Sequence, residues 1–456
     1  MQSALTYANQ NFDHFVERLF DLLRIPSIST DSDYAGDVRK AAEWIADELS
    51  RIGVSTVEVC ETPGHPIVFA HHSVDDSLPT ILVYGHYDVQ PPDPLDLWKS
   101  APFEPEVRDG QIYARGSCDD KGQVFMHIKA IESWIAATGS LPVNVKLIIE
   151  GEEESGSENL ATFIRQNKER LSADIVVISD TAMFAAGVPS ITSGLRGLAY
   201  TEVILTGPDR DLHSGVYGGA VENPINVLCS LIGRLHDDQH RVAVPGFYDG
   251  VVELTAEERK AFEALPFDDN KWMASVGIKA TRTETGYSIH EAITARPTLD
   301  VNGIWGGYQG KGAKTVLPSL AGAKISMRLV PGQDSEKVVA RLKKWFEDNT
   351  PATMKLDFRN LHGGKPVLVD TTSPAMKSAA HAMEDEYGQR PYFTREGGSI
   401  PVVADFKEIL GLDTVLMGFG LNSDAIHSPN EHYGLDRFGE GIRCIIRFLE
   451  YYGQAK

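Results

Sequence analysis

The sequence predicts an α/β protein: a large domain with a mixed, mainly parallel sheet flanked by helices, interrupted by a smaller α+β domain. Two observations lead to this prediction. Up to about Thr192, short apolar runs alternate with helical patterns, as expected for a sheet covered by helices. The pattern then changes to strands of alternating polarity and amphipathic helices, and the first pattern returns after Asp370. We therefore expect residues 1–192 and 375–456 to form the large domain and residues 193–374 the smaller one.

The length and charge of the chain limit its function. At 456 residues it is too long for one ordinary core. The net charge of -21 argues against binding to nucleic acid or to an anionic membrane surface. No apolar run approaches the ~20 residues that span a bilayer, and the first residues lack the basic and apolar regions of a signal peptide. The four cysteines are scattered, without a disulfide framework. We expect a cytoplasmic protein with no nucleic-acid or membrane partner.

Apolar spacing locates the elements of the large domain. Apolar residues recur at helical spacing before Pro26 and again before Gly53, which suits the end of a helix. Thr80 to Val83 is a short apolar run typical of a buried strand. The expected helices are 12–23, 38–52, 122–137, 375–387 and 438–451, and the expected strands are 54–60, 67–70, 80–84, 143–149, 175–178 and 415–418.

Polar side chains follow the carboxyl ends of these strands, which is where ligands bind in open α/β sheets. His86, the acids Glu152 to Glu154, and Asp180 each come after a different expected strand. Asp119 and Asp120 lie in a glycine-flanked loop, and adjacent carboxylates repel each other unless a cation or a proton lies between them. Imidazole and carboxylate donors suit Zn²⁺ or Mn²⁺. The pattern therefore favours a metal site.

Each of these groups also has a simpler interpretation. A lone Asp after a strand, such as Asp180, is commonly a turn residue. His86 and Asp88 can form a local hydrogen-bonded pair. Asp119 and Asp120 can belong to a solvated turn, and the acids Glu152 to Glu154 can be a solvated charge cluster. The position of these groups at the ends of separate strands is what favours the metal site.

The smaller domain is expected to combine a sheet with helices. Apolar and polar residues alternate over 323–329, which indicates a strand with one buried face, and Ser335 is expected to cap an amphipathic helix. Residues 237–298 are too long for one loop, so they hold secondary structure that the pattern does not locate. An exposed apolar sheet edge or face would favour dimerisation. The expected strands are 200–205, 323–329 and 356–358, and the expected helices are 224–235 and 335–349.

A series of motifs in this order and at these spacings resembles the M20 family of dinuclear metallopeptidases, and most closely its cytosolic nonspecific dipeptidase (carnosinase-like) branch. The resemblance covers nearly the whole chain. Each motif is weak alone, and together they are highly specific. The motifs are Gly85-His86-Tyr87-Asp88-Val89-Gln90-Pro91, Arg115-Gly116-Ser117-Cys118-Asp119-Asp120-Lys121-Gly122, Glu150-Gly151-Glu152-Glu153-Glu154-Ser155-Gly156-Ser157-Glu158, Ile178-Ser179-Asp180, Asp211-Leu212-His213-Ser214-Gly215, Lys314-Thr315-Val316-Leu317-Pro318, Arg395-Glu396-Gly397-Gly398-Ser399-Ile400-Pro401 and Asp424-Ala425-Ile426-His427-Ser428.

The resemblance implies two divalent metal ions per subunit, usually Zn²⁺ or Mn²⁺. One would be held by His86, Asp119 and Asp180. The other would be held by Asp119, Glu154 and His427, so that Asp119 bridges both. The resemblance also implies a cis peptide bond directly after Asp119.

The same resemblance implies the catalytic roles. Asp88 would orient the first histidine, a water bridging the metals would be the nucleophile, and Glu153 would act as general base and acid. One departure matters: the family usually has an apolar residue where this chain has Glu152. Three consecutive acids leave the register open, and Ser155-Gly156-Ser157 favours Glu153 as the base and Glu154 as the ligand.

For the smaller domain the resemblance implies a lid that also forms a homodimer. His213 would reach into the partner subunit's site and stabilise the oxyanion, while Thr315, Arg328, His362 and Ser399 would bind the substrate. A guanidinium suits bidentate binding of a carboxylate, which would restrict the enzyme to dipeptides or short peptides with a free C-terminus. Without the family pattern, a loop histidine and a solvent-exposed arginine would be the simpler interpretations of His213 and Arg328.

Two other functions stay open. The same metal centre could serve an N-acyl-amino-acid deacylase or desuccinylase, because it cleaves any amide. The fold could also belong to an inactive binding protein, although every type of metal ligand is present in the sequence.

Overall fold

The computed structural model describes residues 1–398 and 400–455. Within them the chain forms two compact units, each described here by itself. The domain boundaries given above stay predictions. Unit 1 comprises Met1–Ser193, Val369–Thr394 and the described residues from Asp405 onward, and unit 2 comprises Gly194–Leu368 and Arg395–Ala404.

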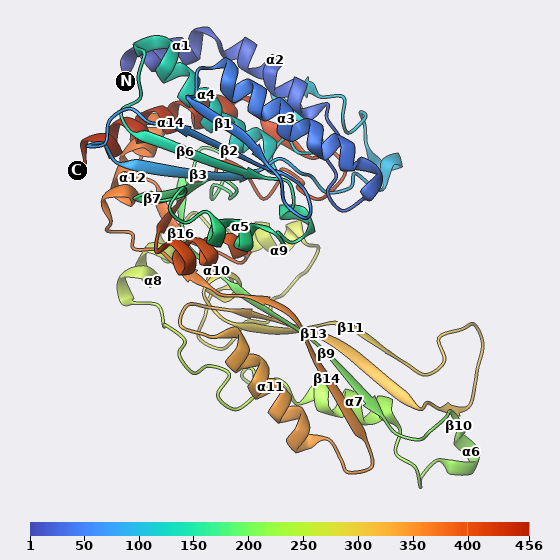
Figure 1. Cartoon of the computed structure of the whole chain (residues 1–456). Helices are drawn as coiled ribbons and strands as arrows, with labels where there is room; N and C mark the ends of the chain where they lie inside the picture. Colours follow the sequence, from blue (N-terminus) through green and yellow to red (C-terminus); the bar gives the residue numbers. More distant parts are fainter. Residues whose placement is uncertain (399, 456) are drawn as a thin grey trace. The chain divides into compact units, whose positions relative to one another are not determined.

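The core of unit 1 is a mixed sheet with parallel strands at its centre (Figure 1). Its strands are β1 (Thr56–Cys60), β2 (Ile67–His72), β3 (Thr80–His86), β6 (Asn144–Glu150), β7 (Ile175–Ile178), β17 (Asp413–Leu416) and β8 (Ser190–Leu195). They lie in the order β1-β2-β6-β3-β7-β17-β8. β3 pairs in parallel with β6 and β7, and β17 pairs in parallel with β7, whereas β1, β2 and β8 pair antiparallel. The predicted α/β class is confirmed, because the central strands are the nearly continuous apolar runs that a sheet covered on both faces requires.

Helices pack against this sheet and against one another. They are α1 (Gln2–Gln10), α2 (Phe12–Leu23), α3 (Ala35–Arg51), α4 (Lys121–Thr138), α5 (Leu160–Gln166), α12 (Pro374–Tyr387) and α14 (Leu435–Gln454). The helix α4 contacts β3, α1, α2 and α14, and its first residues, Lys121 to Trp134, are all buried. A helix that is enclosed in this way can hold the loop before it in a fixed position. Among the described residues, no helix combines the length and the apolar character that crossing a membrane requires.

Short elements complete unit 1. β4 (Glu106–Arg108), β5 (Gln111–Tyr113) and β18 (His432–Gly434) form a separate small sheet. The helical turns are η1 (Ser32–Tyr34), η2 (Leu95–Leu97), η3 (Glu153–Ser155) and the π-helical η4 (Phe406–Leu410), and the strand β16 (Tyr392–Glu396) pairs with β8.

Unit 2 is built on an antiparallel sheet with helices on one face. Its elements are β9 (Gly197–Thr206), β10 (Leu212–His213), α6 (Ser214–Tyr217), α7 (Pro224–Gly233), β11 (Thr298–Gly306), β12 (Val316–Leu317), β13 (Leu320–Leu329), α11 (Ser335–Asn349), β14 (Lys355–Gly364), β15 (Val367–Leu368) and α13 (Pro401–Asp405). The sheet order is β11-β13-β9-β14. Buried and half-buried residues alternate along β9, and the buried side packs against α7 and α11 around Phe346 and Leu228. The helix α11 has the predicted bounds, but its N-cap is Asp334, whose carboxylate accepts the N–H of Lys337, and not Ser335.

The segment that the sequence pattern could not locate contains three short helices, α8 (Ala256–Glu263), α9 (Asp269–Ser275) and α10 (Ile289–Thr294). Thr255 and Ser288 form capping boxes with Glu258 and Glu291. This spacing of Ser or Thr three residues before Glu is a readable start signal for a helix. The helices are too short for an apolar period to stand out, which is why the pattern missed them.

Candidate metal centre

The parallel strands of unit 1 bring distant residues together at one edge of the sheet. His86 ends β3 and lies opposite Glu150 at the end of β6. On the other side, Tyr84 lies opposite Ile178, so Asp180, two residues farther along, reaches the level of His86. Asp119 comes from the loop that precedes α4. The side chains of the candidate centre therefore come from separate elements whose ends coincide.

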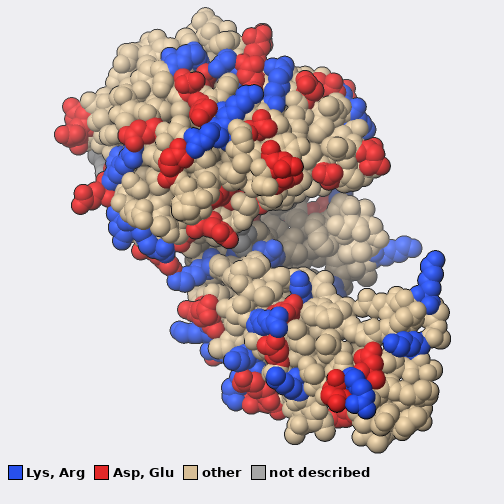
Figure 2. Space-filling model, turned by 45° about the vertical axis from the view of Figure 1, so that its right-hand side comes forward, with Lys and Arg blue, Asp and Glu red and all other residues tan. Residues whose placement is uncertain are grey.

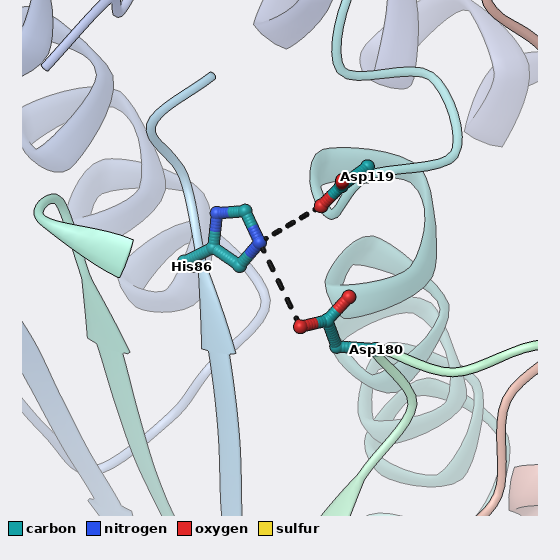
Figure 3. Close-up of side chains that lie close together, drawn as sticks. All are labelled: His86, Asp119 and Asp180. Carbon is teal, nitrogen blue, oxygen red and sulfur yellow. Dashed lines mark hydrogen bonds and ion pairs between the residues drawn. The ribbon is translucent and has the colours of Figure 1, made fainter. Parts of the chain in front are cut away.

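The first group of possible ligands is His86, Asp119 and Asp180 (Figure 3). The Nε2 atom of His86 lies 3.1 Å from Oδ1 of Asp119 and 3.9 Å from Oδ2 of Asp180. Figure 3 shows the two carboxylates facing the same ring nitrogen. One cation could thus be a neighbour of all three side chains.

The second group is Asp119, Glu154 and His427. Nε2 of His427 lies 2.9 Å from Oδ2 of Asp119 and 3.2 Å from Oε2 of Glu154. Asp119 therefore offers one carboxylate oxygen to each histidine. In both groups, the candidate ligand atoms lie within 4.8 Å of one another. The peptide bond between Asp119 and Asp120 is cis, which confirms that expectation.

Asp88 links the first histidine to the glutamate turn. Nδ1 of His86 lies 3.1 Å from the carbonyl oxygen of Asp88 and 3.3 Å from its Oδ1. The two oxygens of the same carboxylate accept the N–H groups of Glu153 at 3.2 Å and Glu154 at 3.0 Å, and the Ser29 hydroxyl donates to it at 2.6 Å. A buried carboxylate in this place fixes the imidazole ring and the turn together.

The three consecutive acids have different surroundings. The carboxylate of Glu152 accepts the N–H of His65 at 2.8 Å and the side-chain amide of Asn159 at 2.9 Å. Glu154 takes part in the second ligand group, and its Oε2 also accepts the amide of Gln90 at 2.8 Å. Glu153 lies between them at the start of η3. This geometry supports the register in which Glu154 is the ligand and Glu153 is the base.

Without a bound cation, only protons can offset the charges of the buried carboxylates in this cluster. The pKa values of these groups are therefore shifted. Burial, and then the charge of Asp119, raises the pKa of Asp180 well above its ordinary value. Burial raises the pKa of Glu153 to about 8. Hydrogen bonds to Asp119 and Glu154 raise the pKa of His427 to about 10. Burial alone would raise the pKa of Asp119, but its bonds to the two histidines lower it.

The donor set fits divalent cations. Buried carboxylates that repel one another hold protons because no stronger positive charge offsets them. Cations bound between carboxylates and imidazoles would replace those protons. Nitrogen and oxygen donors without thiolates suit Zn²⁺ and Mn²⁺. The residues present therefore fit the metal ions that the sequence predicts.

Unit 2 separates the residues predicted to bind substrate into two groups. His213 and Thr315 are neighbours, since the N–H of Ser214 donates to the Thr315 carbonyl at 3.1 Å. Arg328 and His362 flank β9 on its two sides, where they lie opposite Leu198 and Tyr200. Ser399 lies outside the described residues.

The two groups lie near opposite ends of the strand β13. The N–H of Ser319 donates to Asp211 at 3.0 Å, which attaches the ribbon of β10 and β12 to the Leu320 end of β13. Arg328 stands eight positions farther along that strand, a distance of roughly 27 Å at the usual rise of a strand. A single dipeptide cannot contact both groups of the same unit.

Several residues that hold the centre were not singled out in the sequence. Gln90 could have been found, because it continues the alternation of His86 and Asp88 on one face of an extended segment. Glu431 gave no local signal, and Asp424 opens one of the motifs above but received no role there. Glu431 accepts hydrogen bonds from a loop 312 residues earlier, and Asp424 forms a bidentate pair with Arg437 at 2.6 and 2.7 Å.

Comparisons with known proteins agree with this geometry. The sequence model described as "Peptidase family M20/M25/M40" matches residues 82–451. The Cys-Gly metallodipeptidase DUG1 of Candida albicans is 34% identical over 97% of this chain and 95% of its own. The Beta-Ala-His dipeptidase of Homo sapiens is 31% identical over 98% of this chain and 92% of its own. Among solved structures, an M20 family metallo-carboxypeptidase from Sulfolobus solfataricus, Sso-CP2, has a TM-score of 0.86 and 34% identity over 96% of this chain and 99% of its own.

Proposed function

The chain belongs to peptidase family M20/M25/M40 and is a metallopeptidase, and from this we propose that it hydrolyses the peptide bond of dipeptides and short peptides with a free C-terminus. The observation that carries the proposal is the position of Asp119, whose two carboxylate oxygens face two different histidines. A shared carboxylate is what a pair of adjacent cations requires.

Five side chains would hold the cations. His86 and Asp180 would bind one and Glu154 and His427 the other, with Asp119 common to both. When bound, two such cations, Zn²⁺ or Mn²⁺, lower the pKa of a water molecule and polarise the carbonyl group of the scissile bond.

We assign the proton transfers to Glu153. Its neighbours in the sequence are engaged elsewhere, Glu152 with Asn159 and Glu154 with His427, and Asp88 fixes its backbone N–H. Its carboxylate would accept the proton of the attacking water and pass it to the nitrogen of the leaving amine.

The separation inside unit 2 supports a homodimer in which subunits share their sites. His213 lies in the ribbon of β10 and β12 at the Leu320 end of β13, and Arg328 lies near the other end of that strand. We infer that both can act on one substrate only if they come from different subunits. His213 would then stabilise the oxyanion in the partner's site, with Thr315 beside it. Exposed Val301 and Ile304 on the edge strand β11 are apolar groups that a dimer could cover.

Arg328 and His362 would bind the substrate's C-terminal end. A guanidinium holds a carboxylate through two parallel hydrogen bonds, which would select peptides with a free C-terminus. Removal of C-terminal residues from longer peptides is a second candidate function, supported by the similarity to the metallo-carboxypeptidase. Both candidates use the same carboxylate contact, and they differ in how much room the site leaves on the other side of the scissile bond.

A substrate screen tests the proposal. The purified protein, stripped of metal and reconstituted with Zn²⁺ or Mn²⁺, would be given Cys-Gly, Ala-Ala, β-Ala-His, tetrapeptides and N-acetyl amino acids, with Asp119→Asn as the inactive control. We expect rapid cleavage of dipeptides that chelation abolishes. Preference for tetrapeptides would favour the carboxypeptidase. Preference for N-acetyl amino acids would contradict both and favour a deacylase.

A further inference from the structure

The loop that carries Asp119 is held by one carboxylate from the far end of the chain. Glu431 lies just before β18 and has no exposed surface. Its Oε1 accepts the backbone N–H groups of Cys118 at 3.0 Å and Asp119 at 3.1 Å. Its Oε2 accepts the N–H of Gly116 at 3.0 Å and Nη1 of Arg115 at 2.7 Å. Both oxygens are thus used, and one of the four bonds reaches the backbone of Asp119 itself.

These contacts do more than neutralise a buried arginine. Three of the four hydrogen bonds come from backbone N–H groups. The carboxylate therefore mainly fixes the backbone conformation of the loop. Arg115 has a second anchor, since its Nη2 donates to the carbonyl of Pro91 at 3.2 Å. The backbone of Glu431 adds a further contact, because its carbonyl accepts the N–H of Ala114 at 3.2 Å. Four backbone N–H groups of the segment 114–119 are therefore bound by Glu431.

We propose that Glu431 is a positioning residue that sets the bridging carboxylate and so controls both cation sites together. This inference rests on the metal centre proposed above. A displaced backbone at Asp119 would move both of its carboxylate oxygens, and each of them faces a different histidine. Residues that support a single ligand cannot have this double effect. Gln90, for example, donates its side-chain amide to Glu154.

Cation affinity tests the proposal without relying on turnover. Zn²⁺ would be titrated calorimetrically into metal-free wild type, Glu431→Gln and the milder Glu431→Asp. In Glu431→Gln the amide nitrogen would face N–H donors, so we expect both cation affinities to fall by roughly 10- to 100-fold, the usual effect of losing a group that orients metal ligands. In His427→Ala one affinity should fall and the other should stay within a few-fold of wild type.

The matched control is Glu48→Gln. Glu48 is also a buried carboxylate with several cationic partners in unit 1, but it touches no residue of the metal centre. We expect it to lower stability while both cation affinities stay at wild-type values. If Glu431→Gln behaved like this control, the residue would be merely structural and the proposal would be wrong.

Hydrogen exchange provides a test that needs no variant. In the metal-free wild-type protein, the amides of Gly116, Cys118 and Asp119 should exchange slowly, because the Glu431 carboxylate holds them before any cation arrives. Exchange as fast as in a free peptide would overturn the proposal even if every variant failed to fold. This outcome can be distinguished from a failure of the proposed function. A protein that binds two cations but cleaves no dipeptide would contradict the proposed function and would not affect the role of Glu431.

Discussion

Asn159 holds the carboxylate of Glu152, with its side-chain nitrogen 3.0 Å from Oε1 and 2.9 Å from Oε2. This contact occupies the carboxylate of Glu152, which is why we propose Glu153 as the general base. We expect Glu153→Gln to reduce kcat by roughly 10²- to 10⁴-fold, the usual contribution of a general base, with metal content unchanged. Glu152→Gln should keep most of its turnover and lose stability. Steady-state kinetics and metal analysis of both variants test this prediction. A large loss of kcat in Glu152→Gln but not in Glu153→Gln would show that the register of the three acids is shifted by one residue.

Arg328 should act on substrate binding through the terminal carboxylate. Truncation to alanine removes hydrogen bonds to a charged group, each worth about 1.5–3 kcal/mol, so KM for a dipeptide should rise by about 10- to 100-fold. An amidated dipeptide, which has no carboxylate to bind, should show little change in KM between the variant and wild type. An equal rise in KM for the free and the amidated dipeptide would show that Arg328 does not bind the terminal carboxylate.

His213 can be tested by mixing two inactive proteins. A subunit with His213→Ala and a subunit with Glu153→Gln each lack one component, but a mixed dimer contains one complete site if His213 acts in the partner's site. Random mixing of a symmetric dimer should restore about a quarter of wild-type activity. If His213 acts within its own subunit, mixed dimers would contain no complete site and activity would not return.

Glu48 stabilises unit 1 through a buried ion network. It contacts Lys129, Arg18 at 2.8 Å and Arg51 at 2.8 Å. Burial alone would raise the pKa of Glu48, but the hydrogen bonds from Arg51 and Arg18 and the charge of Lys129 lower it below its ordinary value. Glu48→Gln leaves a buried ammonium short of one partner, so urea unfolding at pH 7 should give a free energy lower by about 3 kcal/mol.

The pH dependence of this effect has a definite sign. Because the pKa of Glu48 is lower in the folded protein, its stabilisation is complete above about pH 4.5, the region of the unfolded pKa, and is lost as the pH falls below it. The difference between wild type and Glu48→Gln should therefore shrink in acid. A difference that grew in acid would contradict the assignment.

His127 should make the protein less stable in mild acid. Burial lowers its pKa to about 3, and its Nε2 donates to the Ser179 hydroxyl at 2.8 Å, which in turn donates to the Met417 carbonyl. In the unfolded chain this histidine binds a proton below about pH 6.5, whereas in the folded chain it stays neutral. The free energy of unfolding therefore falls as the pH drops below 6.5, by about 2 kcal/mol at pH 5. Between pH 7 and 5, wild type should lose that much more unfolding free energy than His127→Gln. Parallel losses would show that His127 is not the group responsible.

The sequence allowed the fold and most of the centre to be predicted because their signals are local. Apolar runs locate the strands, and parallel pairing makes the ends of β3 and β7 coincide, so His86 and Asp180 could be placed without a structure. Contacts between distant segments have no such signal. Nothing around Glu431 indicates that it faces the loop of Asp119, and only folding brings the two together.

Some predicted helix starts differ from the observed ones because two neighbouring residues suit the same position equally well. Asp334 and Ser335 are both good N-cap residues, and the structure uses the first. The helices from Ala256 to Thr294 had readable capping signals at Thr255 and Ser288, but a turn or two of helix gives no apolar period to confirm them.

The distance in sequence between Asp119 and His427 has a consequence for synthesis. At roughly 5–20 residues per second, a ribosome needs about 15–60 seconds to travel from one to the other. During that interval the emerging polypeptide carries the first histidine and the shared aspartate without the second histidine or Glu431. A polypeptide that ended anywhere in that span would thus lack His427 and could not complete the second ligand group.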